Sequence, residues 1–141
     1  MRNIILLLPV LLLYACSPAE EAPVVWQTIQ RSLQEQMITA ADGDTIHIPS
    51  GRYMFTRGLQ MDGKRNIVLR GAGKDSTILS FRDQTEGAQG ILITNGISIT
   101  VEDMTIEDAK GDNIKISDTR GITLRRIRSR WTGEQIGRAH V

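Results

Sequence analysis

The chain has 141 residues, a formal net charge of +1, only 4 % aromatic residues and a single cysteine. Setting aside Arg2 and Arg138, which fall in atypical terminal segments, leaves 15 basic and 16 acidic residues, so the overall charge gives no support to nucleic-acid binding. A single cysteine also excludes an intrachain disulfide.

Residues 1–15 have the shape of a secretory signal peptide, with an apolar run over positions 4–13 that is too short to span a bilayer. The next motif, Leu-Tyr-Ala-Cys ending at Cys16, resembles a bacterial lipobox, and this resemblance implies cleavage before Cys16 and lipidation of its sulfur. Ser17, by the same resemblance, favours the outer membrane over the inner membrane. The alternatives are an ordinary signal peptide and a short N-terminal anchor.

Residues 16–23 are small, acidic and proline-bearing, which is typical of a tether. In residues 24–41 the apolar side chains recur at helical spacing, at Val25, Ile29, Leu33, Met37 and Ala40. This pattern predicts an amphipathic helix that covers the open first turn of the domain behind it. A membrane-surface helix is the alternative, but the polar face carries Gln rather than a row of Lys and Arg.

Residues 91–131 repeat themselves at an offset of 23, where seven pairs match, including Ile91 with Ile114 and Ile99 with Ile122. Within each copy apolar and polar residues alternate, and Asn, Asp and Gly separate the short runs, which indicates strands and turns. A repeat of this length is typical of one turn of a solenoid.

The same pattern begins near Asp44, where the apolar positions 46 and 48 match positions 67 and 69 at an offset of 21. This offset predicts a second turn starting at Asn66. From Ile67 to Ile99 the offset is 32 rather than 23, so the surplus should leave the barrel as loop, within segment 71–76 or segment 82–90. Insertions in solenoids gather on one face, and that face often binds.

These residues resemble the right-handed parallel β-helix, the fold of pectate lyases and polygalacturonases. The resemblance covers residues 42–135 and rests on segments 44–51 and 66–73 and on the two turns related by the offset of 23. It implies an all-β solenoid, a right-handed single-stranded parallel β-helix with an N-terminal capping α-helix.

The last six residues, 136–141, have no place in this register. Together with Gln135 they back-translate into a common sequencing adapter, and we interpret them as adapter read-through, with a genuine short C-terminus as the alternative. Residues 42–135 are therefore expected to be an incomplete β-helix, truncated at the C-terminus.

Enzymes on this scaffold, as the resemblance implies, use Asp, Arg or Lys on central turns, where carboxylates bind Ca²⁺ or act as general acid and base. Those turns would lie mostly beyond residue 135, so no catalytic residue is assigned. The candidates for ligand or Ca²⁺ contact are Asp103, Asp108, Asp112 and Asp118. The competing interpretation is that these aspartates stabilise turns. The sequence holds no recognisable His/Cys metal cluster or nucleophile–base pair.

A row of arginines ends the last turn, at Arg125, Arg126, Arg128 and Arg130. At the offset of 23 they fall on Glu102, Asp103, Thr105 and Glu107. Successive turns are about 4.8 Å apart, which predicts exposed arginine–carboxylate pairs that help to fix the register. Binding of an acidic glycan is the alternative role for this row.

We therefore expect an envelope-anchored β-helix lipoprotein that binds or processes polysaccharide, with lyase, hydrolase and epimerase activities not separable. The alternative is a non-catalytic surface scaffold or adhesion module. The expected partners are the membrane, through a lipid on Cys16, and polysaccharide; Ca²⁺ is the one cofactor that the resemblance suggests.

Overall fold

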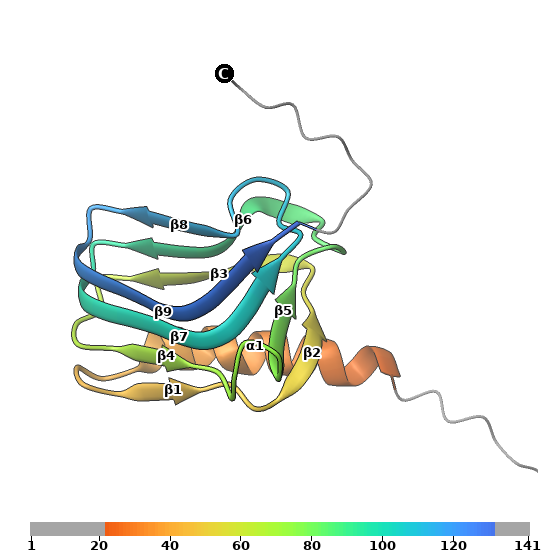
Figure 1. Cartoon of the computed structure of the whole chain (residues 1–141), viewed down its shortest axis with the longest axis horizontal. Coiled ribbons are helices and arrows are strands. Elements are labelled where there is room, and N and C mark those ends of the chain that lie inside the picture. The colour runs from red at the N-terminus through yellow and green to blue at the C-terminus, as the bar shows by residue number, and fades with distance from the viewer. Residues whose placement is uncertain (1–21, 132–141) are drawn as a thin grey trace, which may run out of the picture.

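The computed structural model describes the backbone of residues 22–131 and the side chains of residues 28–131 (Figure 1). The elements in this range are α1 (Ala22–Thr39), β1 (Thr45–His47), β2 (Gly51–Met54), β3 (Arg57–Asp62), β4 (Val68–Arg70), β5 (Thr77–Ser80), β6 (Glu86–Thr94), β7 (Ile97–Glu107), β8 (Ile114–Ser117) and β9 (Arg120–Arg130). The predicted signal peptide, Cys16 and the tail 136–141 lie outside the described residues.

All paired strands in this range are parallel. The chain runs over three faces in each turn: the β1 face (β1, β4 and the first halves of β7 and β9), the β2 face (β2, β5 and the second halves of β7 and β9) and the β3 face (β3, β6 and β8). The result is a parallel β-solenoid of about four turns. This confirms the predicted fold class, including a helix that precedes the strands.

The strand register confirms the offset of 23 in the later turns and corrects the offset predicted for the first. Ile91 pairs with Ile114 and Ile99 with Ile122, as predicted. The offset of 21 between the first two turns is wrong, because Ile46 pairs with Leu69 and not with Ile67. On the β1 face the first two turns therefore share the offset of the later ones. Offsets that differ by two keep every side chain on the same face of a strand, so alternation alone does not distinguish between them.

The surplus of the second turn is divided between the two predicted segments. Pairs that join β4 to β7 have an offset of 32, pairs that join β5 to β7 an offset of 27, and pairs that join β6 to β8 an offset of 23. The first decrease falls in segment 71–76, and the second falls in segment 82–90. The second segment is only partly a loop, because β6 already begins at Glu86.

The core consists of inward side chains that stack turn upon turn. Ile46, Leu69, Val101 and Leu124 occupy equivalent inward positions in four successive turns. The first three are buried, whereas Leu124 in the last described turn is 48 % exposed. The core of each turn is therefore buried by the next turn, as expected for a solenoid of stacked repeats.

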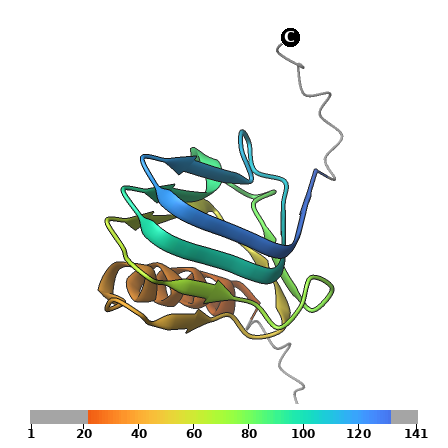
Figure 2. The ribbon, with the colours of Figure 1, turned by 60° about the vertical axis from the view of Figure 1, so that its left-hand side comes forward.

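Helix α1 caps the first turn, and Figure 2 shows it at the end of the stack opposite β8 and β9. Leu33 and Met37 are buried in the core, which confirms the predicted apolar face. Two glutamines of the helix satisfy the open backbone edge beside β3: the Gln34 side-chain amide both accepts from the Gln60 backbone N–H and donates to its C=O, each at 2.8 Å, and Gln30 Oε1 accepts from the backbone N–H of Thr56 at 3.0 Å.

The helix starts at Ala22, so the end of the predicted tether 16–23 is already helical, and it stops at Thr39 rather than at residue 41. Lys64 Nζ donates to the carbonyl of Ala40 at 2.9 Å, just beyond the helix C-terminus, where cations are favoured. In the described part of the chain no helix is long and apolar enough to cross a membrane.

Candidate functional site

The arginine face is the outward side of the β1 and β2 faces, which carries Arg52 and Arg70 from the first two turns and Arg125, Arg126, Arg128 and Arg130 from β9. Strand β9 lies on β7 in the predicted register, with Arg125 next to Glu102 and Arg130 next to Glu107. The predicted pairing of the arginines with the preceding turn is confirmed by the contacts below.

Glu102 lies between two arginines from the turns on either side. Its Oε1 accepts from Arg70 Nε at 2.5 Å, and its Oε2 accepts from Arg125 Nε at 2.7 Å. The hydrogen bond from Arg70 is the main cause that lowers the pKa of the Glu102 carboxyl, and it outweighs the opposing effect of burial, with further lowering from Arg125. Glu102 therefore stays ionised over a wider pH range than an ordinary glutamate.

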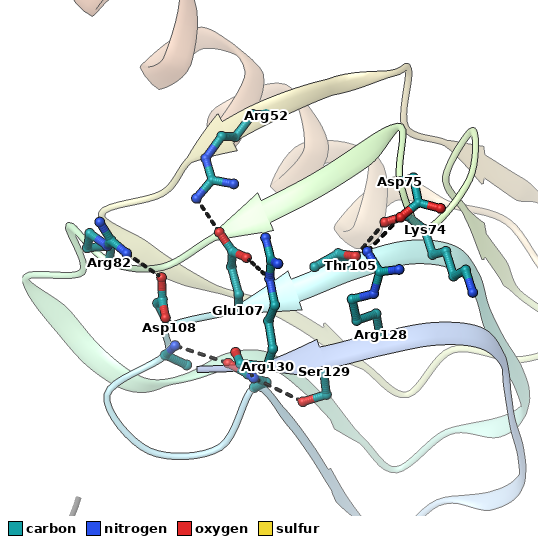
Figure 3. A network of polar contacts seen from close by, with 12 residues as sticks. Arg52, Lys74, Asp75, Arg82, Thr105, Glu107, Asp108, Arg128, Ser129 and Arg130 are labelled. Carbon is teal, nitrogen blue, oxygen red and sulfur yellow. Dashed lines mark hydrogen bonds and ion pairs between the residues drawn. The ribbon is translucent and has the colours of Figure 1, made fainter. Parts of the chain in front are cut away.

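Glu107 repeats this arrangement on the β2 face (Figure 3). Its Oε2 accepts from Arg130 Nε at 2.6 Å, and its Oε1 accepts from Arg52, two turns earlier. Each of these two glutamates thus joins a β9 arginine to an arginine of an earlier turn.

Asp103 and Arg126 form a third pair at the bend between the β1 and β2 faces. Both residues have positive φ, 60° and 51°, so the long strands β7 and β9 bend at equivalent points. Arg126 Nε and Nη2 donate to the two carboxylate oxygens of Asp103 at 2.5 and 2.6 Å. This bidentate hydrogen bonding is the main cause that lowers the pKa of Asp103 and raises the pKa of Arg126.

Arg128 is adjacent to Thr105 in the register, as predicted, but its carboxylate partner comes from the insertion 71–76. Arg128 Nη1 donates to Asp75 Oδ1 at 2.6 Å, and Thr105 Oγ1 donates to the Lys74 carbonyl at 2.5 Å (Figure 3). The insertion therefore lies against the arginine face.

The prediction of exposed ion pairs is wrong for the carboxylates of Glu102 and Glu107. The side chains of Glu102 and Glu107 are at most 1 % exposed, whereas the β9 arginines that cover them remain 42–54 % exposed. The reason is the stacking itself, because each of these glutamates has a guanidinium on both sides. The solvent-exposed surface therefore carries more guanidinium groups than carboxylates, although the two kinds of group are paired.

The four candidate aspartates do not come together. Asp103 is held by Arg126, and Asp108 is buried at a positive-φ position with Arg82 Nη2 at 3.4 Å. Asp112 and Asp118 are not part of the arginine face, and Asp118 has a φ of 50°. The described residues contain no group of three or more His, Cys, Asp or Glu side chains that could hold a metal ion. Ligand or Ca²⁺ contact by these aspartates stays a prediction, and the positive φ of Asp108 and Asp118 agrees with the turn interpretation for these two.

Sequence reasoning missed three members of this network. Arg70 and Glu102 are related by the same offset of 32 that relates Ile67 to Ile99, so offset arithmetic would have found this pair. Arg52 and Asp75 are different, because they reach Glu107 and Arg128 across turns whose insertions shift the register.

The fold and network define this chain as a parallel β-solenoid with an arginine face. It matches no protein-family model, no curated protein and no solved structure.

Proposed function

We propose that this protein is an envelope-anchored lipoprotein that binds an acidic polysaccharide through its arginine face. The observation that carries the proposal is the excess of positive charge at that surface. Six arginines stand against four carboxylates, from Asp75, Glu102, Asp103 and Glu107, and two of the carboxylates are covered by the arginines.

The arginines are also held in place. Each is fixed by a carboxylate, so less side-chain entropy is lost when a ligand binds. Arg128 and Arg130 stand two positions apart on one strand, a separation of about 6.5–7 Å. A chain of acidic sugars lying along β9 would meet one guanidinium after another, and guanidinium groups bind carboxylate or sulfate groups in a bidentate manner.

Binding fits this surface better than chemical processing. A general acid needs a proton near neutral pH, which requires a raised pKa. The pKa values of Glu102 and Asp103 are lowered instead, because arginines donate hydrogen bonds to them. These carboxylates accept hydrogen bonds from the arginines and hold them in place, and they are poorly suited to protonate a leaving group.

The test is a double variant, Arg126→Gln with Arg128→Gln, in the full-length protein. Their partners Asp103 and Asp75 have side chains 21 % and 70 % exposed, so neither change leaves a fully buried carboxylate unpaired. Binding of sodium polygalacturonate should weaken at least tenfold while the thermal melt changes little. Binding should also weaken with salt, since exposed charges are screened.

The matched control is Arg57→Gln on the β3 face, where Arg57 forms an exposed pair with Glu86. This control should bind polygalacturonate as the wild type does. If the double variant also binds like the wild type, the arginine face is not the polysaccharide site. The stacked arginine–carboxylate pairs, which form an arginine ladder across the turns, would then favour the rival function. That function is a non-catalytic surface scaffold in which the arginines hold successive turns in register.

A further inference from the structure

A crevice of about 660 Å³ lies between α1 and β3. A smaller hollow of about 210 Å³ continues over β3 and β6, and the two share the segment 57–60. Both lie at the β3 face, which belongs to a different sheet from the arginine face. The larger volume is within the range of about 300–1,000 Å³ that is usual for small-ligand sites.

Three glutamines are among the residues that line this crevice, Gln30, Gln34 and Gln60. Gln30 and Gln34 are held rigidly by their hydrogen bonds to the backbone beside and within β3. Within the described residues, Gln30 uses its Oε1 and not its Nε2 for hydrogen bonds. Gln34 Nε2 donates one of its two N–H groups to Gln60, so its second N–H can donate to a ligand. The crevice therefore offers preorganised hydrogen-bonding groups at little entropic cost.

The charges that line the crevice and the adjoining hollow balance when they are counted together. Arg31 and Arg57 are matched by Glu35 and by Glu86, which lines the adjoining hollow and pairs with Arg57 at 2.9 Å. Two large apolar residues also line the crevice: Leu59 is buried, and Ile38 is 61 % exposed. The crevice and the hollow thus combine amides, charges that balance overall and one exposed apolar side chain.

We propose that this crevice binds an uncharged glycan that carries N-acetyl groups. A side-chain amide donates one hydrogen bond and accepts another, which matches the N–H and C=O of an acetamido group. The acetyl methyl group would pack on Ile38, and the sugar hydroxyls would use the remaining groups of Gln30 and Gln60. A neutral ligand brings no charge of its own that the crevice would have to compensate.

A glycan suits this crevice better than an extended peptide. Peptides commonly bind beside a sheet by adding a strand to an open edge. Here Gln34 already occupies both backbone groups of Gln60 on that edge, and Gln30 occupies the N–H of Thr56. Strand addition is therefore blocked, and side-chain recognition remains.

The experiment is calorimetric titration of the full-length protein with chitohexaose, the neutral hexamer of N-acetylglucosamine. The double variant Ile38→Ser with Gln60→Ala should weaken binding at least tenfold. It spares the cap, because only the backbone of Gln60 bonds to Gln34. Cellohexaose, which lacks the acetamido groups, should bind at least tenfold more weakly than chitohexaose.

The matched control is Ile97→Ser with Gln36→Ala, which removes an exposed isoleucine and an exposed glutamine that do not line the crevice. This control should bind chitohexaose like the wild type. The Arg126→Gln and Arg128→Gln double variant should do so too, so the result is independent of the arginine face. The proposal is overturned if the wild type does not bind chitohexaose, if the crevice variant binds it equally well, or if cellohexaose binds as tightly.

Discussion

Glu102 is the most informative position at which to test the arginine ladder, because it joins three turns of the solenoid. We consider Glu102→Ala, Arg125→Ala and the double variant in the full-length protein. The Ala change at Glu102 removes the hydrogen bonds from both Arg70 and Arg125. Arg125→Ala removes only the partner of Glu102 on β9 and leaves Arg70 in place.

The magnitude follows from the burial of the two partners. A hydrogen bond to a charged group contributes about 1.5–3 kcal/mol when shielded, whereas exposed pairs contribute about 0.2–1 kcal/mol. Glu102 is covered, but by arginines that are themselves about half exposed, so an intermediate value applies. We expect Glu102→Ala to cost about 2 kcal/mol and Arg125→Ala about 1 kcal/mol, with a favourable coupling of about 1 kcal/mol between them.

The measurement is urea unfolding of all four proteins at pH 7 and again in acid. The pKa of Glu102 is lower in the folded state than its ordinary value, so its contribution is fully present above an unfolded-state pKa of about 4.3 and is lost as the pH falls through the folded pKa. The coupling should therefore shrink below about pH 4. A coupling near zero at pH 7, or one that is unchanged in acid, would refute the ladder as a source of stability.

The cap, the core and the anchor each give one further prediction. Gln34→Ala should lower the free energy of unfolding by about 1–2 kcal/mol, because Gln60 loses both backbone partners, whereas Gln36→Ala should not; equal melts would contradict the capping role. Ser80→Ala should raise stability by about 1 kcal/mol, because Ser80 Oγ is buried without a partner in the described part of the chain, and a lower melting temperature would count against this. Cys16→Ser should move the protein from membranes to the soluble fraction, and full membrane retention would rule out the lipid as the anchor.

The architecture could be predicted from the sequence because the physical signals there are local and repeated. Alternation of apolar and polar residues indicates the strands, and the offset of 23 places Ile99 on Ile122 and Glu102 on Arg125, as the structure has them. The spacing of the apolar residues, including Leu33 and Met37, predicts the helix, and these two side chains are buried in the structure. Alternation does not supply absolute register, and for that reason the offset of 21 gives Ile46 the wrong partner.

The glutamines of α1 show a second limit. In the sequence they only argue against a membrane-surface helix, because a Gln on a polar face is equally consistent with simple solvation. Their role depends on where the edge of β3 lies, and that position is set by the packing of Leu33 and Met37 beneath the first turn. Polar contacts of this kind depend on the tertiary arrangement, and they produce no repeating pattern that could be recognised in the sequence.

The insertion 71–76 explains why the arginine face could be predicted only in part. A chain without insertions would place every outward side chain beside the residue one period away, and offset arithmetic would find all the partners. The insertion instead places Asp75 beside Arg128, two turns further along, and the Lys74 carbonyl on Thr105. Arg128 is thereby fixed from the side rather than from the turn below. The same loop that breaks the arithmetic also holds this arginine at the surface, so a change in its length should alter the geometry of the face as well as the length of the loop.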